Sequence, residues 1–184
     1  GCTFEDNYVS GAASVGADCE LYNNTIDGKV TLRGANIVAS ENIINNAVTI
    51  SASNITFKNN NVTGTVTVSA NGNVIEGNNI SSTGNYAVDL GSKTGNNVTG
   101  NYLLAKEKYG KDAVHSTGAD NIIEDNRPYD PELVVKVDDI VVGEDAVINV
   151  TVNENASGVA TVIVDGKTYI AAKYWTPHQK ANFF

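Results

Sequence analysis

Residues 55–62 read ITFKNNNV, and this pattern of alternating apolar residues followed by polar residues and an asparagine recurs along residues 1–127. Other copies read CELYNNTI at residues 19–26 and IVASENII at residues 37–44. Seven asparagines close the copies, and the middle ones are spaced by eighteen residues: Asn7, Asn24, Asn42, Asn60, Asn78, Asn101 and Asn126. A fixed period of this length is typical of a solenoid, whose stacked units share one continuous core.

A second set of apolar residues lies between these copies at the same spacing: Val30 and Leu32, Val48 and Ile50, and Val66 and Val68. Apolar residues two positions apart indicate β-strands, so each unit carries at least two short strands. Units stacked about 4.8 Å apart pair such strands in parallel. The sequence therefore predicts an all-β fold, a right-handed single-stranded parallel β-helix of about seven rungs over residues 1–127. The right-handed sense is favoured because the pattern has no six-residue subperiod and the rung length varies from 17 to 25 residues.

The recurring asparagine has a structural interpretation in such a coil. Its side-chain amide both donates and accepts hydrogen bonds, so stacked copies form an Asn ladder and bond the turn backbone. A buried turn needs these partners, because an unpaired buried polar group costs about 1–3 kcal/mol. A row that binds sugar or metal is the alternative, and the ladder is favoured because the row lies inside the repeat pattern.

Beyond Asn78 the spacing grows to 23 and then 25 residues, through insertions in residues 82–87 and 104–112.

Two cysteines, Cys2 and Cys19, occupy the same position in the first two copies. Equivalent inward positions on neighbouring rungs place the Cα atoms about 5 Å apart, within the range of a disulfide. A bridge would join the first two rungs and would indicate an oxidising, extracellular environment. Two small buried apolar side chains are the alternative, and both interpretations remain open at this point.

The repeat pattern stops at residues 127–131, which read RPYDP and whose two prolines are expected to break strand pairing. We expect a linker over residues 128–132. Longer alternating segments follow at residues 133–137, 146–152 and 158–164, and Asp165-Gly166 is a hairpin signal. These segments predict a truncated immunoglobulin-like (Ig-like) β-sandwich over residues 133–172, because a complete one needs about 100 residues. Residues 173–184 form a tail that fits neither pattern.

Composition excludes several classes of partner for this chain of 184 residues. Its net charge is −9 and only 12 residues are Lys or Arg, without a basic cluster, so nucleic acid and anionic membrane surfaces are not expected partners. No apolar run approaches the roughly 18 residues that span a membrane. The chain contains no Met and begins within a repeat, which predicts that it is part of a longer polypeptide.

Catalytic residues are not expected, and the weak candidates are Asp89, His115 and Asp120. Enzymes built on a parallel β-helix need carboxylates clustered on adjacent rungs, for acid/base chemistry or for calcium. The repeat alignment places His115 near the position of Leu90, which points it inward as a hydrogen-bonded core histidine. The paired Asp residues and the Gly-His-Gly tripeptide of polygalacturonases are absent, so a polysaccharide-degrading enzyme is the alternative rather than the main expectation.

No metal and no cofactor is expected from the sequence motifs. The sequence lacks the Gly-Gly-x-Gly-x-Asp calcium repeat, the zinc-type spacing of Cys and His, and a phosphate-binding loop. Several Asn-x-Ser/Thr sequons occur, and Asn61 is the one that we expect to be exposed and glycosylated.

The stretch NITFKNNNVTG at residues 54–64 resembles the parallel β-helix repeats of adhesin-like surface proteins of methanogenic archaea. The stretch VTVNENASGVATV at residues 150–162 is similar to the start of the Ig-like repeat that follows them in such proteins. The resemblance covers about residues 1–170, without the second half of the Ig-like unit or the tail. It implies a secreted or cell-surface, non-catalytic rod that presents a rigid surface to glycans or proteins of a cell or host. The alternatives are a carbohydrate-active enzyme and a structural spacer of the cell envelope.

Overall fold

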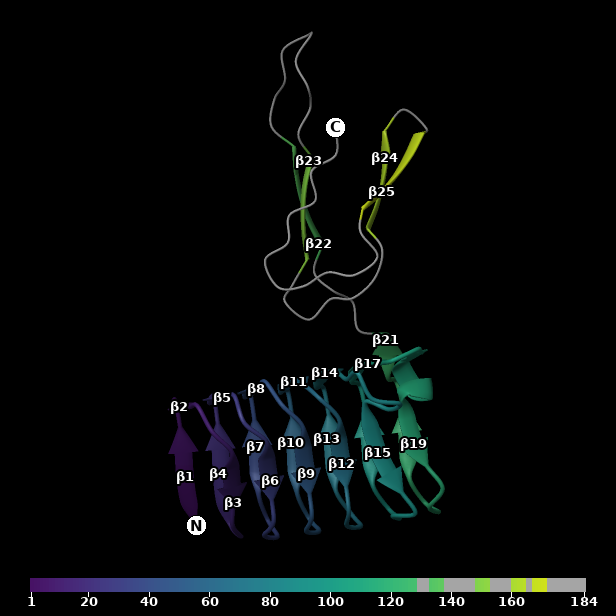
Figure 1. Ribbon diagram of the computed structural model, residues 1–184. Helices are drawn as coiled ribbons and strands as arrows, with labels where there is room; N and C mark the ends of the chain where they lie inside the picture. The colour runs from purple at the N-terminus through teal and green to yellow at the C-terminus, as the bar shows by residue number, and fades with distance from the viewer. Residues whose placement is uncertain (129–132, 138–147, 153–159, 165–166, 172–184) are drawn as a thin grey trace. The chain divides into compact units, whose positions relative to one another are not determined.

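The computed structural model describes residues 1–128, 133–137, 148–152, 160–164 and 167–171. The chain divides into two compact units, Gly1–Tyr129 and Asp130–Phe184. The first unit is a parallel β-solenoid, in which the rungs follow one another from the purple N-terminal end to the green end near residue 128 (Figure 1). The predicted all-β solenoid is therefore confirmed for this unit. The right-handed sense of the coil stays a prediction.

Each full rung contributes three short strands, one to each of three sheets, whereas the sequence pattern predicted at least two. Sheet A contains β1 (Cys2–Glu5), β4 (Cys19–Tyr22), β7 (Val38–Ser40), β10 (Thr56–Lys58), β13 (Val74–Glu76), β16 (Asn97–Thr99) and β20 (Ile122–Glu124). Sheet B contains β2 (Tyr8–Val9), β5 (Thr25–Ile26), β8 (Ile43–Ile44), β11 (Asn61–Thr63), β14 (Asn79–Ser81), β17 (Tyr102–Ala105), β18 (Lys108–Tyr109) and β21 (Arg127–Pro128). Sheet C contains β3 (Ala13–Val15), β6 (Val30–Leu32), β9 (Val48–Ile50), β12 (Val66–Val68), β15 (Val88–Gly91) and β19 (Val114–Ser116).

The core is a set of apolar columns that run through the rungs. In sheet A the inward column includes Leu21, Ala39, Phe57 and Ile75, paired in register and fully buried. In β6, β9 and β12 of sheet C the two apolar residues of each strand point inward and the residue between them points outward, as the alternation of a strand requires. Because every rung repeats the same pattern, the core is continuous along the solenoid.

The seven asparagines of the repeat form a hydrogen-bonded ladder inside the corner between sheets A and B. The Oδ1 atom of Asn60 accepts both the backbone N–H and the side-chain Nδ2–H of Asn42, at 2.9 Å each. The Nδ2 group of Asn60 donates to the carbonyls of Ala39 and Lys58, at 3.0 Å each. The same bonds recur from Asn7 to Asn126, so each amide closes its own turn and ties it to the neighbouring rungs.

A second, shorter asparagine ladder lies at the start of the sheet A strands and was not expected from the sequence pattern. Its members are Asn73, Asn96 and Asn121, and the Oδ1 atom of each accepts the backbone N–H of the residue one rung earlier. In earlier rungs the same inward column holds Ile37 and Ile55, and these need no polar partner. The same position of the rung is therefore occupied by apolar side chains in the earlier rungs and by asparagine side chains in the later ones.

The corners of the rungs hold two columns of residues with left-handed backbone, at φ between 51° and 67°. One column precedes the main ladder: Asp6, Asn23, Glu41, Asn59, Gly77, Gly100 and Asp125. The other precedes sheet A: Asp18, Asn36, Asn54, Gly72, Gly95 and Asp120. Gly, Asn and Asp tolerate this backbone conformation best, which explains why they dominate the junctions of the repeat.

Glu41 is the one member of these columns whose side chain suits the left-handed conformation poorly. We expect Glu41→Asn to raise the free energy of unfolding of the solenoid by about 1 kcal/mol, because Asn adopts positive φ more readily. The exposed hydrogen bond from the Tyr22 hydroxyl to Glu41, 3.2 Å long, is weakened by the change and contributes little. Urea denaturation measures the effect, and Glu76→Asn on a strand of sheet A is the control. A midpoint that falls for Glu41→Asn would contradict the prediction.

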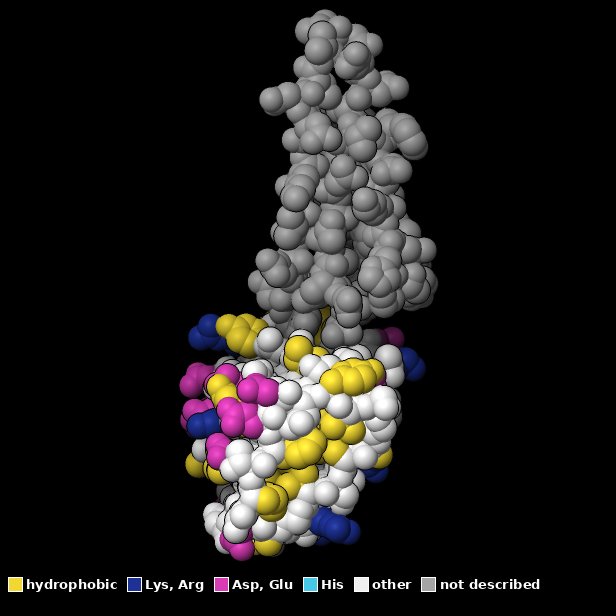
Figure 2. Space-filling view, turned by 90° about the vertical axis from the view of Figure 1, so that its left-hand side faces the viewer, with side chains coloured by type: hydrophobic (Ala, Val, Ile, Leu, Met, Phe, Trp, Pro, Cys, Tyr) yellow, Lys and Arg dark blue, Asp and Glu magenta, His cyan; other side chains and the backbone are white. Residues whose placement is uncertain are grey.

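Cys2 and Cys19 are joined by a disulfide between β1 and β4, and their Cα atoms are 4.6 Å apart. The bridge lies at the N-terminal end of the described solenoid. Phe4 is 41% exposed there, and a hollow of about 340 Å³ is lined by residues that include Phe4, Val9 and Val15. Figure 2 shows this apolar end, with acidic side chains along one edge of it.

The inserted residues after Asn101 form a small additional element at the other end of the solenoid. The chain leaves β17, turns back into the antiparallel strand β18, and continues through a 3₁₀ helix at Gly110–Ala113. Pro128 then lies in β21, paired with Leu103, so the expectation that pairing stops at the first proline is wrong. This strand lies at the edge of the parallel stack, where a missing N–H is tolerated.

The second unit contains two antiparallel strand pairs among its described residues. Strand β22 (Leu133–Val137) pairs with β23 (Ile148–Val152), and β24 (Ala160–Val164) pairs with β25 (Lys167–Ala171). The Ig-like sandwich over residues 133–172 stays a prediction. Three predicted features lie outside the described residues: the hairpin signal Asp165-Gly166, residues 129–132 of the linker, and the tail at residues 173–184. In the part of the chain that the structure describes, no helix is long and apolar enough to span a membrane.

Candidate functional site

The outward column of sheet C gathers the most varied polar chemistry of the solenoid. Its members pair in register from rung to rung: Ser14, Thr31, Thr49, Thr67, Asp89 and His115. Parallel strands stand about 4.8 Å apart, so these side chains form a straight row. Hydroxyl groups on four successive rungs therefore lead directly to a carboxylate and an imidazole.

The hydroxyl groups of this row are free to bind a ligand. Thr31, Thr49 and Thr67 are half-buried, and none of their side-chain hydroxyls has a hydrogen-bond partner within residues 1–128. Lys29 and Arg33 flank Thr31 on its own rung and are exposed on the same face, because they alternate with the buried Val30 and Leu32. The face thus offers both donors and acceptors to solvent.

Asp89 and His115 form the one hydrogen-bonded pair of a histidine and a carboxylate in the described residues. The Nδ1 atom of His115 lies 2.8 Å from Oδ1 of Asp89, and their side chains are 36% and 39% exposed. An ionised carboxylate only accepts, so Nδ1 donates its proton to Asp89 and Nε2 is left for another partner. Asp89 also accepts the backbone N–H of Gly91 at 3.0 Å, which fixes the carboxylate in place.

The two insertions supply side chains that enclose this pair. Tyr86, in the insertion before β15, stacks on the His115 ring with centroids 4.7 Å apart and an angle of 18° between the planes. Lys108 of β18 places its Nζ atom 3.7 Å from the centroid of the Tyr86 ring. A cation at this distance is attracted by the face of the ring. The imidazole is therefore held between its carboxylate partner and an aromatic ring.

The structure corrects the position expected for His115. It pairs with Asp89 on the outer face of the sheet and does not take the inward place of Leu90. The physical reason is the length of the inserted segment before β19: Asp89 and His115 are 26 residues apart, one more than the 25 residues between Asn101 and Asn126 on which the repeat count relied. Val114 takes the place that corresponds to Val88, and the histidine follows it on the outside.

Asp120 does not join this cluster. It lies exposed in the left-handed corner before β20, in the column that contains Gly95, and it starts a turn of the coil. No hydrogen bond or ion pair within residues 1–128 connects it to Asp89 or His115. The structure thus brings together two of the three candidate residues. The third, Asp120, occupies a corner position that requires positive φ.

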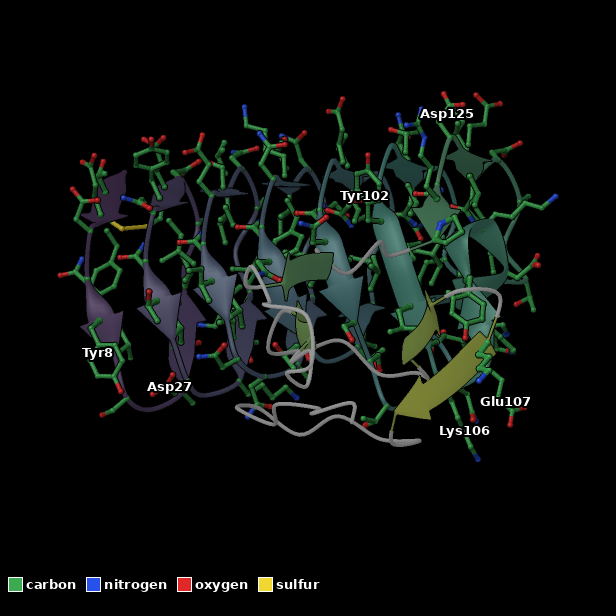
Figure 3. All side chains as sticks on the ribbon, turned by 90° about the horizontal axis from the view of Figure 1, so that it is seen from above. Tyr8, Asp27, Tyr102, Lys106, Glu107 and Asp125 are labelled. Carbon is green, nitrogen blue, oxygen red and sulfur yellow. A yellow bond between two sulfur atoms is a disulfide. The ribbon has the colours of Figure 1, made fainter. Side chains whose placement is uncertain are left out.

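Two tyrosine–carboxylate pairs lie on the outer surface near the N-terminal end. The Tyr8 hydroxyl donates to Asp27 at 2.6 Å, and Asn45 donates to the same carboxylate at 2.9 Å (Figure 3). The hydrogen bond and the negative charge of Asp27 raise the pKa of Tyr8, and the bond from Tyr8 lowers the pKa of Asp27. The hydrogen bond to Glu41 likewise raises the pKa of Tyr22.

These directions predict how the pair between Tyr8 and Asp27 responds to pH. The lowered pKa of Asp27 means that its contribution to stability is present above the ordinary value of 3.8 and is lost as the pH falls through the folded-state pKa. The raised pKa of Tyr8 means that its contribution is present below 10.0 and is lost as the pH rises through the folded-state pKa. The deprotonation of the tyrosines at alkaline pH can be followed by their ultraviolet absorbance.

We expect Asp27→Asn to move one late-titrating tyrosine to lower pH in that titration and to remove part of the loss of stability in acid. Asp125→Asn, an exposed corner residue without a tyrosine partner among the described residues, is the matched control and leaves the tyrosine titration unchanged. The same tyrosine titration in both variants would show that the hydrogen bond does not form in solution.

Asn61 lies on the outer face of β11 but is half-buried rather than exposed as expected, whereas Thr63 of its sequon is exposed on the same face. Asn79 occupies the equivalent position on the next rung and is exposed. Glycosylation of Asn61 stays a prediction. The described residues contain no group of three or more His, Cys, Asp or Glu side chains placed to hold a metal ion.

Comparison of the chain with protein-family models, with curated proteins and with solved structures found no match. The resemblance to adhesin-like proteins therefore rests on the residues quoted for it.

Proposed function

We propose that this chain is part of a secreted or cell-surface attachment protein of the adhesin type. The observation that supports it is the register of the outward columns, which repeats similar side chains on successive rungs. A partner with its own repeating units, such as a cell-surface glycan or protein array, can contact several rungs at once. Each contact is weak, and the linked contacts together give an avidity well above that of any one of them.

Rigidity is the second requirement of such a surface, and the Asn ladders supply it. Each buried amide bonds the rung before it and closes its own turn, so a rung cannot tilt without breaking several bonds. A rigid row of contacts loses little conformational entropy when a ligand binds. The ladder is thus a structural feature, and the outward columns are the binding feature.

Two properties support an extracellular location and glycan or protein partners. The disulfide between Cys2 and Cys19 is of a kind that persists in oxidising environments. The net charge of −9 disfavours nucleic acid as a partner. Both properties fit a surface protein that meets solvent and other cells.

A carbohydrate-active enzyme is the second candidate function, and the Asp89–His115 pair is the observation that favours it. A histidine oriented by a carboxylate is a suitable general base if substrate reaches its Nε2 atom. Hydrolysis or elimination of a sugar chain needs a further acid or cation near the same bond. Asp120, the third candidate residue, lies in a corner of the coil.

The experiment that tests the proposal is a glycan array probed with the whole chain, with release of reducing or unsaturated sugar ends followed in parallel. We expect binding without cleavage. Cleavage that Asp89→Asn abolishes would overturn the proposal in favour of the enzyme. Neither binding nor cleavage would overturn it in favour of a structural spacer of the cell envelope.

A further inference from the structure

The acidic side chains of the solenoid are not evenly distributed over its faces. The outward positions of sheet A carry Glu5, Glu20, Glu76 and Glu124, and further carboxylates occupy the left-handed corners. The outward column of sheet C contains a single carboxylate, Asp89, which is hydrogen-bonded to His115. In a chain of net charge −9, sheet C is therefore a face of low negative charge.

Cations gather at both ends of this face. Lys29 and Arg33 lie beside Thr31 near one end, both exposed. Lys108 lies at the other end against Tyr86, beside His115. None of the three cationic side chains has an ion-pair partner within residues 1–128. Between the two ends the face carries the row of hydroxyls and then the hydrogen-bonded pair of Asp89 and His115. Along the axis of the solenoid it therefore offers cations, hydroxyls, this pair and a further cation.

We propose that the outer face of sheet C binds a linear, carboxylate-bearing polysaccharide, a polyuronate, along the axis of the solenoid. This inference rests on the proposed attachment function and names the face and the class of ligand. Sugar carboxylates pair with Lys29 and Arg33 at one end and with Lys108 at the other. Sugar hydroxyls exchange hydrogen bonds with Thr31 and its equivalents on the next rungs.

Charge complementarity selects this ligand over a neutral glycan. Arg33 has the planar group that binds a carboxylate through two parallel hydrogen bonds, and Lys29 adds a second charge on the same rung. A polyanion is repelled by the protein as a whole and by the carboxylates of sheet A in particular. It therefore binds where cations are exposed and carboxylates are few, and sheet C meets both conditions.

The test measures binding of polygalacturonate to the whole chain by calorimetry, with fully methyl-esterified polygalacturonate as the uncharged ligand of the same backbone. Lys29→Gln with Arg33→Gln removes the cations of the proposed face. Lys58→Gln with Arg127→Gln is the matched control, because it removes the same charges from sheets A and B. A third variant, Thr31→Val with Thr49→Val and Thr67→Val, removes the hydroxyls and keeps the shape of the strands.

We expect the double variant at Lys29 and Arg33 to lose roughly tenfold in affinity, and the control to lose less than about twofold. The threonine variant is expected to weaken binding, and added salt is expected to weaken it in the parent chain. Equal losses in the test and control variants would show general charge attraction and overturn the assignment to sheet C.

The same measurements separate this inference from the proposed function. Tight binding of the methyl ester, or binding to other glycans of the array but not to polygalacturonate, would overturn the polyuronate and leave the attachment function standing. Absence of binding to any glycan would overturn both.

Discussion

Replacing Asn60 with Ala is expected to lower the free energy of unfolding of the solenoid by about 4 kcal/mol. Asn60 is buried, and its Oδ1 atom accepts two hydrogen bonds from Asn42. Its Nδ2 group donates to the carbonyls of Ala39 and Lys58 and to Oδ1 of Asn78. Alanine leaves several of these buried groups without a partner, and each unsatisfied group costs about 1–3 kcal/mol.

Urea denaturation followed by circular dichroism measures this effect. Asn79→Ala, an exposed asparagine on the neighbouring rung, is the control and is expected to change stability by less than about 0.5 kcal/mol. Asn60→Asp keeps the shape and loses the donors, so it is expected to destabilise the chain as well. Equal stability of the Asn60 and Asn79 variants would mean that the ladder does not hold the rungs together.

Replacing Phe57 with Ala is the second change for which we expect a loss of about 4 kcal/mol. Phe57 is the largest fully buried side chain of the core, in β10 at the middle of sheet A. It stacks in register between Ala39 and Ile75 on the adjacent rungs. Ala39 has a small side chain that cannot move into the cavity left by the ring, so the cavity stays largely unfilled.

Phe57→Leu keeps most of the volume and is expected to cost about 1 kcal/mol, and Lys58→Ala on the outer face is expected to cost less than about 0.5 kcal/mol. The graded series distinguishes loss of core volume from a general effect on the strand. A similar small loss for Phe57→Ala and Phe57→Leu would indicate that the rung readjusts around the missing ring.

Spacing in the sequence was sufficient to predict the stacking of the rungs. Asn24, Asn42, Asn60 and Asn78 recur every eighteen residues, and a residue that recurs once per rung must form a column. The alternation of Val48, Thr49 and Ile50 likewise predicts which side chains point inward. These features depend only on the period of the repeat, and the period can be read from a single sequence.

Features that depend on departures from the repeat were harder to predict. The second ladder could have been found, because Asn73, Asn96 and Asn121 are separated by the same 23 and 25 residues as the corresponding members of the main ladder. The contact between Asp89 and His115 could not, because the inserted segment makes their separation 26 residues, and one residue more or less there changes the face that the histidine occupies. The stacking of Tyr86 on His115 depends on two insertions that share no pattern.

The corners of the rungs show how one residue type can be mistaken for a site. Asp120 has the chemistry of a catalytic carboxylate, but it occupies the same corner as Gly95 and Asn54, where positive φ is the requirement. Asp and Asn recur in this column because of their backbone preference. Chemistry on a solenoid is therefore better sought in the outward columns of the strands.

The most direct test of multivalent attachment is the affinity of the whole chain for one glycan, prepared as oligomers that range from a disaccharide to a long polymer. The glycan is the strongest ligand on the array. We predict an affinity that rises about 100-fold as the oligomer grows long enough to cross several rungs, because each rung adds a linked contact. Equal affinity for the shortest and longest oligomers, or no binding to any glycan, would contradict the proposal that the columns act together as one attachment surface.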